Sequence, residues 1–284
     1  MLTGVGDIYG VIGDPIEHSL SPQMHNAAFK KLGLNCIYLP FRVTRRDLKS
    51  AVMGIRALNI RGINVTVPHK TAVVKFLDEL DESAQVIGAA NTILNDEGRL
   101  IGYNTDGLGA ARALEEQGED PSDKRIVLIG AGGAARAIAF TLARRARSIF
   151  ILNRTQRKAV ELAKAIERKL GKKILARSLA RNSLLEALRD ADILINATSA
   201  GMYPRTERTV ATRNVLHSGM VVFDIVYNPV KTLLLREAKA AGAKTVPGVD
   251  MLVHQGAEAF KIWTKYSPPV EVMRRAVMKG LSGR

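Results

Sequence analysis

The sequence of 284 residues has one cysteine, one tryptophan and no long run of apolar residues. A single cysteine excludes an internal disulfide and any zinc site built on cysteines. A membrane-spanning helix needs roughly 18 uncharged apolar residues in succession, and no segment meets that requirement. Cys36 stands in the apolar run 36–41, where we expect it to be a small buried hydrophobe.

The sequence also shows neither a leader signature nor the spacing typical of a metal site. Its first residues lead directly into a strand-like segment without the basic start and apolar stretch of a signal peptide, so we expect a cytoplasmic protein. Five histidines are present, and none is spaced as metal ligands are, so we expect no bound metal. They are His18, His25, His69, His217 and His254.

Acidic residues are few relative to basic ones, with 27 Asp and Glu against 42 Lys and Arg, which gives a formal net charge of +15. Such an excess can serve a nucleic-acid partner, because phosphates are neutralised by clustered Lys and Arg, or an anionic substrate and cofactor. The basic runs at 143–147 and 167–173 lie on predicted helices, without interleaved aromatic residues or an RNA-binding or zinc-finger signature. They indicate solvated helix faces, and we expect no nucleic-acid partner.

The length and the order of apolar segments predict two α/β domains. The chain is about twice the usual domain size, and 46% hydrophobic with 24% charged residues is the composition of a globular protein. Apolar strands alternate with amphipathic helices along the whole chain. A polar, turn-rich break at 118–123 separates two such series.

The two series are predicted as follows. The first has strands at 8–12, 36–41 and 62–66, helices at 23–32 and 46–58, a hairpin of 92–94 with 100–103, and a helix at 107–117. The second has strands at 125–129, 148–152, 193–196 and 221–223, a short strand near Ile174, and helices at 134–145, 156–170 and 183–188. Helices at about 251–266 and 270–279 end the chain without another strong strand.

A glycine-rich loop follows the strand at 125–129 and opens a helix. It has the pattern G-x-G-x-x-A, in which Gly130 can make the tight turn, Gly132 lets the backbone approach a pyrophosphate, and Ala135 allows close packing of helix on strand. The helix N-terminus offers free N–H groups to phosphates. The loop therefore predicts a dinucleotide site, with a simple packing turn as the alternative. It is not a nucleotide-triphosphate loop, because no Gly-Lys-Ser/Thr follows.

The residues after the next strand indicate which dinucleotide is bound. Sites that prefer NAD carry a carboxylate about 20 positions beyond the loop, which holds the ribose 2′-hydroxyl. Here the segment 153–158 reads Asn-Arg-Thr-Gln-Arg-Lys, with several cations and no carboxylate. We infer NADP, with Arg154 and Arg157 as the contacts of its 2′-phosphate. The alternative is that these are only basic residues at a helix start, where they would oppose the helix dipole.

Polar residues stand near the ends of several predicted strands in the first series. Ser19 and Ser21 precede a helix, and Asn64 and Thr66 lie on one face of an otherwise apolar strand, with Lys70 beyond. Open α/β sheets bind ligands at strand ends, and polar side chains there are costly unless something hydrogen-bonds them. The two serines near a helix N-terminus suit a small carboxylate, although Ser21 alone could be an N-cap.

Nine motifs, in this order along the chain, carry a resemblance. They are His-Ser-Leu-Ser-Pro at 18–22, Asn-Val-Thr-Val-Pro-His-Lys at 64–70, Gly-Ala-Ala-Asn-Thr at 88–92, Tyr-Asn-Thr-Asp-Gly at 103–107, the glycine loop at 130–135, Asn-Arg-Thr at 153–155, Asn-Ala-Thr-Ser at 196–199, Asp-Ile-Val-Tyr-Asn-Pro at 224–229 and Gly-Val-Asp-Met-Leu-Val-His-Gln at 248–255. Together they resemble the shikimate dehydrogenase family over about residues 8 to 265.

The resemblance implies reversible reduction of 3-dehydroshikimate to shikimate by NADPH, a step toward chorismate and the aromatic amino acids. It implies that Ser19, Ser21 and Tyr227 hold the substrate carboxylate. The substrate's ring oxygens would contact Asn64, Thr66, Lys70, Asn91, Asp106 and Gln255. The expected cofactor contacts are Gly130, Ala131, Gly132, Gly133, Ala134, Ala135, Asn153, Arg154, Thr155, Arg157, Thr198, Ile225 and Gly248.

The resemblance also implies the domain arrangement. An N-terminal open α/β domain, 1–107, binds substrate and is completed by C-terminal helices at 250–284 that return to it, while 108–249 form a Rossmann-type doubly wound domain that binds NADP. One departure is Ile225-Val226, where some members have methionine. The sequence does not decide between a monomer and a homodimer.

Lys70 and Asp106 would be the catalytic pair. Hydride transfer to a ketone leaves a developing alkoxide, and an ammonium group positioned by a carboxylate can stabilise that charge and deliver a proton. Lys70 is then the acid and Asp106 its orienting partner, with a surface salt bridge as the alternative. The hydride chemistry belongs to the cofactor.

Two other functions remain open. A catabolic quinate/shikimate dehydrogenase shares nearly all these motifs, but such enzymes often use NAD and have an acidic residue near 153–155, which is absent here. A non-catalytic protein that binds NADP or nucleic acid is indicated only by the glycine loop and the charge.

Overall fold

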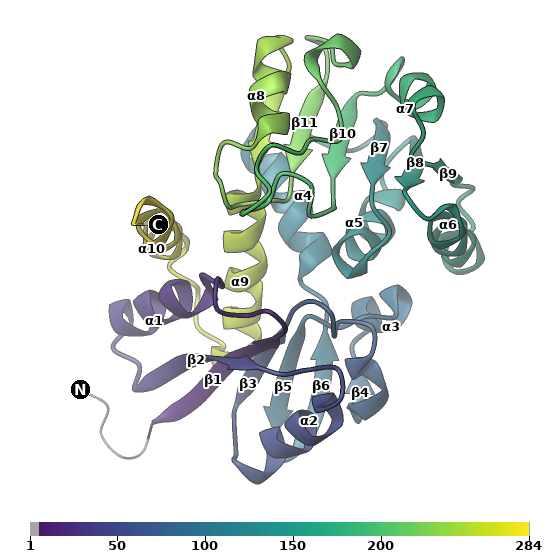
Figure 1. The fold of residues 1–284 in the computed structure, drawn as a ribbon. Coiled ribbons are helices and arrows are strands. Elements are labelled where there is room, and N and C mark those ends of the chain that lie inside the picture. The colour runs from purple at the N-terminus through teal and green to yellow at the C-terminus, as the bar shows by residue number, and fades with distance from the viewer. Residues whose placement is uncertain (1–5, 284) are drawn as a thin grey trace. The chain divides into compact units, whose positions relative to one another are not determined.

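The computed structural model describes residues 6–283, which form two compact units (Figure 1). Unit 1 runs to Asp106 and resumes at Val253, and unit 2 is Gly107–Leu252. Each unit has its own six-stranded sheet. Residues 1–5, on which the expectation about a leader rests, lie outside the described part. Between residues 6 and 283, no helix is both long and apolar enough to cross a membrane.

The sheet of unit 1 brings several strand ends to one edge. Its order is β2-β1-β3-β5-β6-β4, with β1 parallel to β2 and β3, and β5 antiparallel to both β3 and β6. The carboxyl ends of β1, β3 and β6 therefore meet the amino end of β5. The strands are β1 (Asp7–Gly13), β2 (Cys36–Arg42), β3 (Gly62–Val65), β4 (Glu79–Leu80), β5 (Thr92–Asp96) and β6 (Arg99–Tyr103).

The predicted hairpin is confirmed and closes tightly. Asp96 pairs with Arg99, so the loop between β5 and β6 consists of Glu97 and Gly98 alone. Both have positive φ, 50° and 90°, as a two-residue turn of this twist requires. Asn95 Oδ1 accepts a hydrogen bond from the Gly98 backbone N–H at 2.8 Å, which fixes the turn and with it the register of the two strands.

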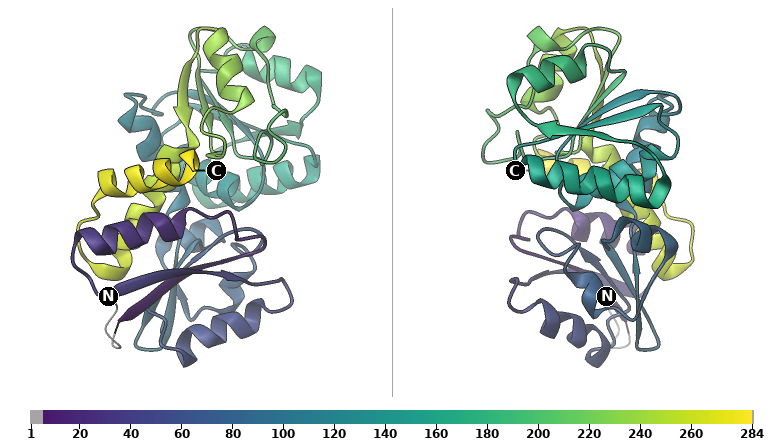
Figure 2. Two further views of the ribbon diagram at one scale, coloured as in Figure 1. Left: turned by 60° about the vertical axis from the view of Figure 1, so that its left-hand side comes forward. Right: turned by 90° about the vertical axis from the view of Figure 1, so that its right-hand side faces the viewer.

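The C-terminal helices belong to unit 1, as predicted. Figures 1 and 2 show α10 beside α1. A Cβ at Gly256 of α9 would lie 2.1 Å from Met24 Cε of α1, so a side chain at this position would force Met24 to move. Besides the short turn η1 (Val73–Phe76), the helices are α1 (Ser21–Lys31), α2 (Leu48–Ala57), α3 (Glu82–Ile87), the later part of α9 (Gly248–Thr264) and α10 (Val270–Ser282).

An aromatic cluster joins these helices to the sheet. Trp263 of α9 lies against Tyr9 of β1 and Tyr38 of β2, and its Nε1 donates to Ile93 O at 2.9 Å. His25 of α1 stacks on Tyr38 with ring centroids 4.5 Å apart. His25 is fully buried, neither ring nitrogen has a hydrogen-bond partner among the described residues, and burial lowers its pKa to about 3. His25 is therefore neutral in the folded protein.

Unit 2 is the predicted Rossmann-type doubly wound fold. All neighbouring strands are parallel, in the order β12-β11-β10-β7-β8-β9, and the order reverses at β7. The strands are β7 (Arg125–Ile129), β8 (Ser148–Asn153), β9 (Leu175–Ser178), β10 (Ile193–Asn196), β11 (Val221–Asp224) and β12 (Lys244–Pro247). The helices are α4 (Asp106–Glu116), α5 (Gly133–Ala143), α6 (Gln156–Leu170), α7 (Arg181–Leu188) and α8 (Leu233–Ala240), with a short turn η2 (Arg213–Val215).

No further strong strand was predicted after 221–223, and the helix α8 and the weak strand β12 that come next were missed. β12 reads Lys-Thr-Val-Pro and buries only Val246, because it is the edge strand, whereas β10 and β11 are buried along their whole length. An edge strand needs no continuous apolar run. The short elements η1, β4 and α3 were missed for the same lack of a long pattern.

The expectation that Cys36 is buried was also wrong. Cys36 is the first residue of β2, which forms an edge of the sheet in unit 1, and its side chain is partly exposed. Partial burial, reinforced by the nearby charge of Asp7, raises the pKa of the Cys36 thiol. The thiol is therefore protonated at neutral pH.

We expect His25→Phe to change the pH dependence of stability. The unfolded chain binds a proton at His25 near pH 6.5, whereas the folded protein does so only near pH 3. Because the unfolded state binds more protons between these values, the wild-type free energy of unfolding falls with falling pH by about 1.4 kcal/mol per unit from this group. His25→Phe removes that contribution, so its advantage over wild type grows as the pH falls below about 6.5.

The free energy of unfolding is measured by urea unfolding, followed by the fluorescence of Trp263, the only tryptophan, which lies in unit 1. The exposed His217, changed to Gln, serves as the control. A constant difference between His25→Phe and wild type across this pH range would contradict the prediction.

Candidate active site

The loops after β1 and β3 approach each other closely at the sheet edge of unit 1. The Thr66 backbone N–H donates to Ile12 O at 3.0 Å, and the Asp14 N–H donates to Val67 O at 3.0 Å. A Cβ at Gly13 would lie 2.4 Å from Thr66 Cγ2, so a glycine is needed here. Loops from neighbouring parallel strands thus meet at the switch point of the order β2-β1-β3, where open sheets bind ligands.

The first loop presents the two predicted serines. Ser21 is the first residue of α1 and is 8% exposed, and its backbone N–H donates to Ser19 Oγ at 3.3 Å. The N-cap position is Leu20, and no side chain caps this helix. The alternative that Ser21 serves as an N-cap is therefore wrong. Both hydroxyls lie at the start of an 11-residue helix, where the helix dipole favours an anion.

The second loop carries Lys70 and is anchored on both sides. The Ala90 backbone N–H donates to Lys70 O at 2.8 Å. The adjacent His69 is fully buried, with its Nε2 2.7 Å from Val43 O. Because a carbonyl oxygen only accepts, His69 Nε2 carries the proton and donates it. The backbone on either side of Lys70 is thereby fixed while its side chain extends to the sheet edge.

Lys70 and Asp106 form a close ion pair. Lys70 Nζ lies 2.5 Å from Asp106 Oδ2, and the two side chains are 15% and 5% exposed. The alternative of a surface salt bridge does not describe a pair buried to this degree. Asp106 follows β6 and begins α4, and Lys70 follows β3. Because β5 pairs antiparallel with both strands, these two residues come into contact although they lie 36 positions apart in the sequence.

Asn91 organises the groups around this pair. It is 2% exposed, and its Nδ2 lies 2.9 Å from both Asp106 Oδ1 and Thr105 Oγ1 and 3.4 Å from Gln255 Oε1. Its Oδ1 accepts from the Thr105 backbone N–H at 2.8 Å and from Thr92 Oγ1 at 3.0 Å. Gln255 of α9 is thus brought to the sheet edge from a distant part of the sequence. Asp106 keeps both carboxylate oxygens occupied by donors.

Asn64 forms the neighbouring part of the same network. Its Nδ2 donates to Asn91 O and to Thr92 Oγ1, each at 3.1 Å, and its Oδ1 accepts from Tyr38 Oη at 2.7 Å. Asn64 pairs with Thr92 across β3 and β5, so the contacts follow from the strand register.

The structure places eight predicted substrate-side residues in unit 1, namely Ser19, Ser21, Asn64, Thr66, Lys70, Asn91, Asp106 and Gln255. Hydrogen bonds join five of them into one network, namely Asn64, Lys70, Asn91, Asp106 and Gln255. Tyr227 lies in unit 2, and its approach to the two serines stays a prediction. Sequence reasoning missed Tyr38 and Thr105. Thr105 lies within the motif at 103–107, which is one of the nine that carry the resemblance. Tyr38 lies in the apolar run 36–41, where its phenol oxygen is the one feature that could have indicated a role in the site.

The predicted cofactor residues all lie in unit 2, at the carboxyl ends of its strands. The glycine loop follows β7, the segment 153–157 begins at the last residue of β8, Thr198 follows β10, Ile225 follows β11 and Gly248 follows β12. Because all strands are parallel, these ends share one edge of the sheet. A Cβ at Gly248 would lie 2.5 Å from Ile225 O, which places the last two segments in contact.

The two loop glycines differ as expected from their positions in the pattern. Gly130 has a φ of +125°, and a Cβ there would lie 2.7 Å from Ala197 O. Gly132 precedes the first turn of α5 with an ordinary φ of −82°, and an added Cβ would meet nothing within 4 Å. Gly130 is required by the fold, whereas Gly132 leaves open space beside the start of α5.

Beyond β8, cations are exposed at the start of α6. Arg154 and Arg157 are both solvent-exposed, and the one ion pair of Arg157 within residues 6–283 is a long i,i+4 contact of 3.7 Å with Glu161. Asn153 Nδ2 donates to Thr155 O at 2.9 Å, which fixes the turn into the helix. The guanidinium groups are therefore available to a phosphate without breaking a buried ion pair.

A buried carboxylate shapes the ends of β10 and β11. Asp224 Oδ1 accepts from Asn196 Nδ2 at 2.9 Å and from the Val226 N–H at 3.1 Å, and Oδ2 accepts from Thr232 Oγ1 at 2.6 Å. Burial raises the pKa of Asp224 to about 6. Asn196 Oδ1 in turn accepts from Thr198 Oγ1 at 2.7 Å. The turns carrying Thr198, Ile225 and Tyr227 are thereby fixed.

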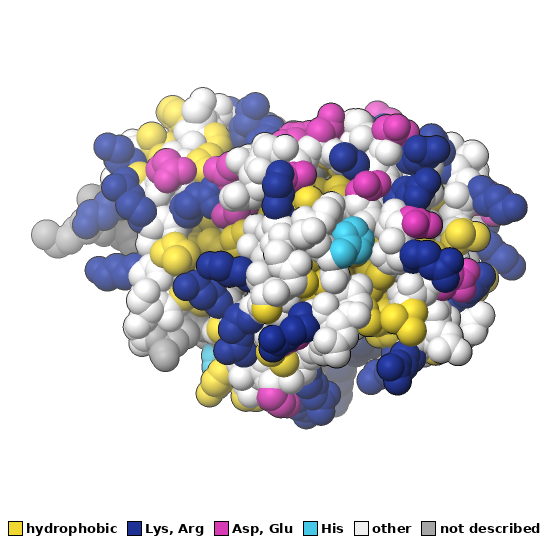
Figure 3. Space-filling model, turned by 90° about the horizontal axis from the view of Figure 1, so that it is seen from above, with side chains coloured by type: hydrophobic (Ala, Val, Ile, Leu, Met, Phe, Trp, Pro, Cys, Tyr) yellow, Lys and Arg dark blue, Asp and Glu magenta, His cyan; other side chains and the backbone are white. Residues whose placement is uncertain are grey.

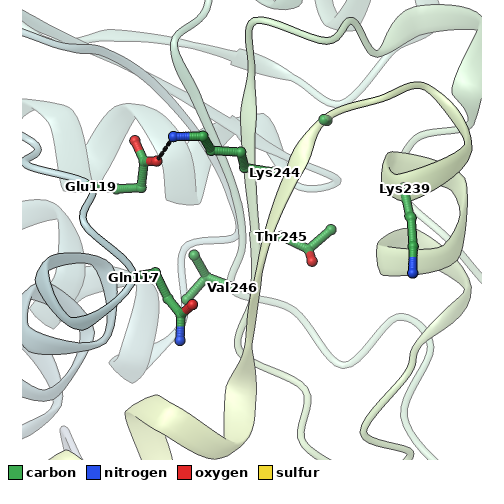
Figure 4. Close-up of a pocket in the computed structure, with 7 residues that line it drawn as sticks. Gln117, Glu119, Lys239, Lys244, Thr245 and Val246 are labelled. Carbon is green, nitrogen blue, oxygen red and sulfur yellow. Dashed lines mark hydrogen bonds and ion pairs between the residues drawn. The ribbon is translucent and has the colours of Figure 1, made fainter.

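One pocket of the surface is lined by none of these residues. A pocket of about 350 Å³ in unit 2 lies at the amino end of β12, opposite the edge that carries the cofactor candidates (Figure 4), and it is lined by Gln117, Glu119, Lys239, Ala243, Lys244, Thr245 and Val246. On the face shown in Figure 3, Lys and Arg side chains are interspersed with acidic and apolar ones. Within residues 6–283, no three His, Cys, Asp or Glu side chains cluster as a metal site would need.

Three family profiles match successive parts of the chain. Residues 11–93 match the shikimate dehydrogenase substrate binding domain, 112–231 match shikimate / quinate 5-dehydrogenase, and 248–278 match the shikimate 5'-dehydrogenase C-terminal domain.

Individual proteins agree with these matches over nearly the whole chain. A shikimate dehydrogenase (NADP(+)) of Methanosarcina acetivorans is 52% identical over 96% of this chain and 98% of its own length. A crystal structure of a shikimate dehydrogenase in complex with NADP+ superimposes with a TM-score of 0.94 at 49% identity, covering 99% of this chain and 98% of its own. A crystal structure of the enzyme from Thermus thermophilus in complex with NADP(H) and shikimate superimposes with a TM-score of 0.87 at 36% identity. The match covers 97% of this chain and 100% of the other. The chain belongs to the shikimate dehydrogenase family.

Proposed function

We propose that the protein is an NADP-dependent shikimate dehydrogenase, which reversibly reduces 3-dehydroshikimate to shikimate on the route to chorismate and the aromatic amino acids. The observation that carries this function is the buried pair of Lys70 and Asp106 at 2.5 Å, surrounded by amide and hydroxyl groups at one sheet edge. Full-length identity of about 50% to NADP(+)-dependent shikimate dehydrogenases supports it.

Lys70 acts as the general acid in the direction of ketone reduction. NADPH supplies the hydride, and the carbonyl oxygen of the substrate becomes an alkoxide as the hydride arrives. The ammonium group of Lys70 stabilises this charge and donates the proton that completes the hydroxyl. Asp106 orients Lys70 through Oδ2, while Asn91 holds Oδ1 at 2.9 Å. In shikimate oxidation the neutral amine of Lys70 accepts the proton.

The remaining residues of unit 1 bind and orient the substrate. Ser19 and Ser21, at the start of α1, receive its carboxylate, and Tyr227 of unit 2 is proposed as a further contact. Asn64, Thr66, Asn91 and Gln255 receive ring oxygens. A polyhydroxylated acid suits this site because each buried polar group gains a hydrogen-bond partner that an apolar ligand would not supply.

Unit 2 binds the cofactor. The open space beside Gly132 and the start of α5 fits a pyrophosphate, and the exposed Arg154 and Arg157 fit a 2′-phosphate. We assign the substrate domain to 1–107 with 250–284 and the NADP domain to 108–249. Thr198, Ile225 and Gly248, at the same sheet edge, complete the cofactor contacts. The protein is assigned to the cytoplasm, as a monomer or homodimer.

Parallel assays of shikimate and quinate, each with NADP and NAD, test the proposed function. We expect the highest kcat/KM for shikimate with NADP. The segment after β8 has no carboxylate that could hold a ribose 2′-hydroxyl, and it has two arginines that can bind a 2′-phosphate. Faster turnover of quinate with NAD would instead assign the catabolic activity. Salt-sensitive binding of DNA without turnover of either acid would assign a non-catalytic role.

Lys70→Ala is expected to lower kcat by roughly 10²- to 10⁴-fold, the usual contribution of a general acid. Binding of shikimate should weaken less, because the hydroxyl and amide contacts remain. Lys49→Ala, which changes an exposed lysine of α2, is the matched control. Steady-state kinetics with shikimate and NADP measure both variants, and an unchanged kcat in Lys70→Ala would remove Lys70 from the mechanism.

The pair Gly130→Ala and Gly132→Ala separates folding from cofactor binding. Gly130→Ala forces an alanine to a φ of +125° and against Ala197 O, so we expect a loss of about 1–3 kcal/mol in stability. Gly132→Ala should keep the wild-type melting temperature but raise the Kd for NADP by about tenfold or more, since its methyl group occupies the space assigned to the pyrophosphate.

Thermal melting and calorimetric titration with NADP measure the two effects. Wild-type affinity in Gly132→Ala would show that the phosphates bind elsewhere.

A further inference from the structure

Tyr38 is a buried side chain that touches the substrate site without lining it. It lies on β2 and is 1% exposed. Asn26 of α1 holds its backbone, donating through Nδ2 to Tyr38 O at 3.0 Å and accepting at Oδ1 from the Tyr38 N–H at 2.8 Å. The ring stacks on His25 at 4.5 Å with an interplanar angle of 10°. The ring position of Tyr38 is thus fixed by α1 before any ligand arrives.

The phenol oxygen of Tyr38 joins two parts of the site. Tyr38 Oη donates to Asn64 Oδ1 at 2.7 Å. The side chain of Ser21 lies close enough to lower the pKa of Tyr38 against the larger, opposing effect of burial. The phenol of Tyr38 therefore lies between the helix start assigned to the carboxylate and the amide assigned to a ring oxygen.

The orientation of the Asn64 amide follows from these bonds. Both hydrogens of its Nδ2 are used, one toward Asn91 O and one toward Thr92 Oγ1, each at 3.1 Å. Its Oδ1 accepts one hydrogen bond, from Tyr38, and no other among residues 6–283. A carbonyl-type oxygen has two lone pairs, so the capacity of Asn64 that remains for a ligand is that of an acceptor.

We propose that Tyr38 is a positioning residue that holds the oxygen of Asn64 in place as a hydrogen-bond acceptor toward substrate, so that Asn64 selects a hydroxyl over an ether or a carbonyl at that position. This rests on the proposed function, and it adds the direction of one contact and the residue that holds it. Asn91 O and Thr92 Oγ1 both act as acceptors and keep the NH₂ group of Asn64 turned toward them. Without the phenol, Asn64 Oδ1 loses its donor from Tyr38 and the amide is held from the nitrogen side alone, so its oxygen is placed less precisely for a substrate hydroxyl.

Tyr38→Phe tests this by removing one oxygen while leaving the ring stacked on His25. Asn64 contacts substrate before and during the reaction, so we expect the KM and the calorimetric Kd for shikimate to rise about tenfold, with kcat and the KM for NADP within about twofold of wild type. Tyr9→Phe is the matched control. Tyr9 pairs with Tyr38 in the strand register and also contacts Trp263, yet within the described residues it forms no side-chain hydrogen bond to a site residue.

A double-mutant cycle with Asn64→Ala separates positioning from general loosening of the core. If Tyr38 acts through Asn64, Tyr38→Phe should cause no further loss in the Asn64→Ala background. A full additional loss there, or Tyr38→Phe kinetics equal to those of Tyr9→Phe, would overturn the proposal. Melting temperatures of all variants are compared, and a Tyr38→Phe protein that loses kcat and stability together also counts against it.

The same measurements separate this proposal from the proposed function. If wild type and Tyr9→Phe do not turn over shikimate, the assigned activity fails. If both turn it over and Tyr38→Phe matches them, only the role of Tyr38 fails.

Discussion

The side-chain amide of Asn91 is the interaction on which the polar edge of unit 1 depends. One buried amide contacts the loop after β6, the ion-paired carboxylate of Asp106 and Gln255 of α9. Each of these partners is itself poorly exposed, so leaving one unsatisfied would cost about 1–3 kcal/mol. The amide can serve all of them because it presents donors and an acceptor from a single planar group. Lys70 therefore meets a carboxylate whose orientation is already fixed by neutral groups.

The sheet order explains why residues scattered over the sequence collect at this edge. β5 runs antiparallel between β3 and β6, so its amino end lies beside their carboxyl ends. In unit 2 the same result comes from parallel strands alone, since every loop that follows a strand emerges on one side. The two units thus gather their predicted site residues at one sheet edge by different pairings. In both cases the backbone ladder places the groups at the strand ends, and in unit 1 the packing of α9 adds Gln255 to them.

Much of this could be predicted from sequence where local chemistry fixes the structure. Gly130 predicts a tight turn, and Gly132 predicts open space beside the helix start. Buried parallel strands such as β7 are recognised as continuous apolar runs. Edge elements such as β12 carry no such pattern and were missed. Cys36 was misjudged because an apolar run does not reveal which of its residues lies at an exposed strand end. Tyr38 was missed since its ring is core and only its oxygen belongs to the site.

The discontinuity of unit 1 has a consequence for how the protein is made. Trp263 and the C-terminal helices supply part of its core, as the bond from Trp263 Nε1 to Ile93 O and the contact of α10 with α1 show. A chain leaving the ribosome completes unit 2 while the first 106 residues still lack these helices. During that interval the face of the first sheet that Trp263 later covers is open to other apolar surfaces. Helices that are synthesised after unit 2 therefore complete the unit that was begun before it.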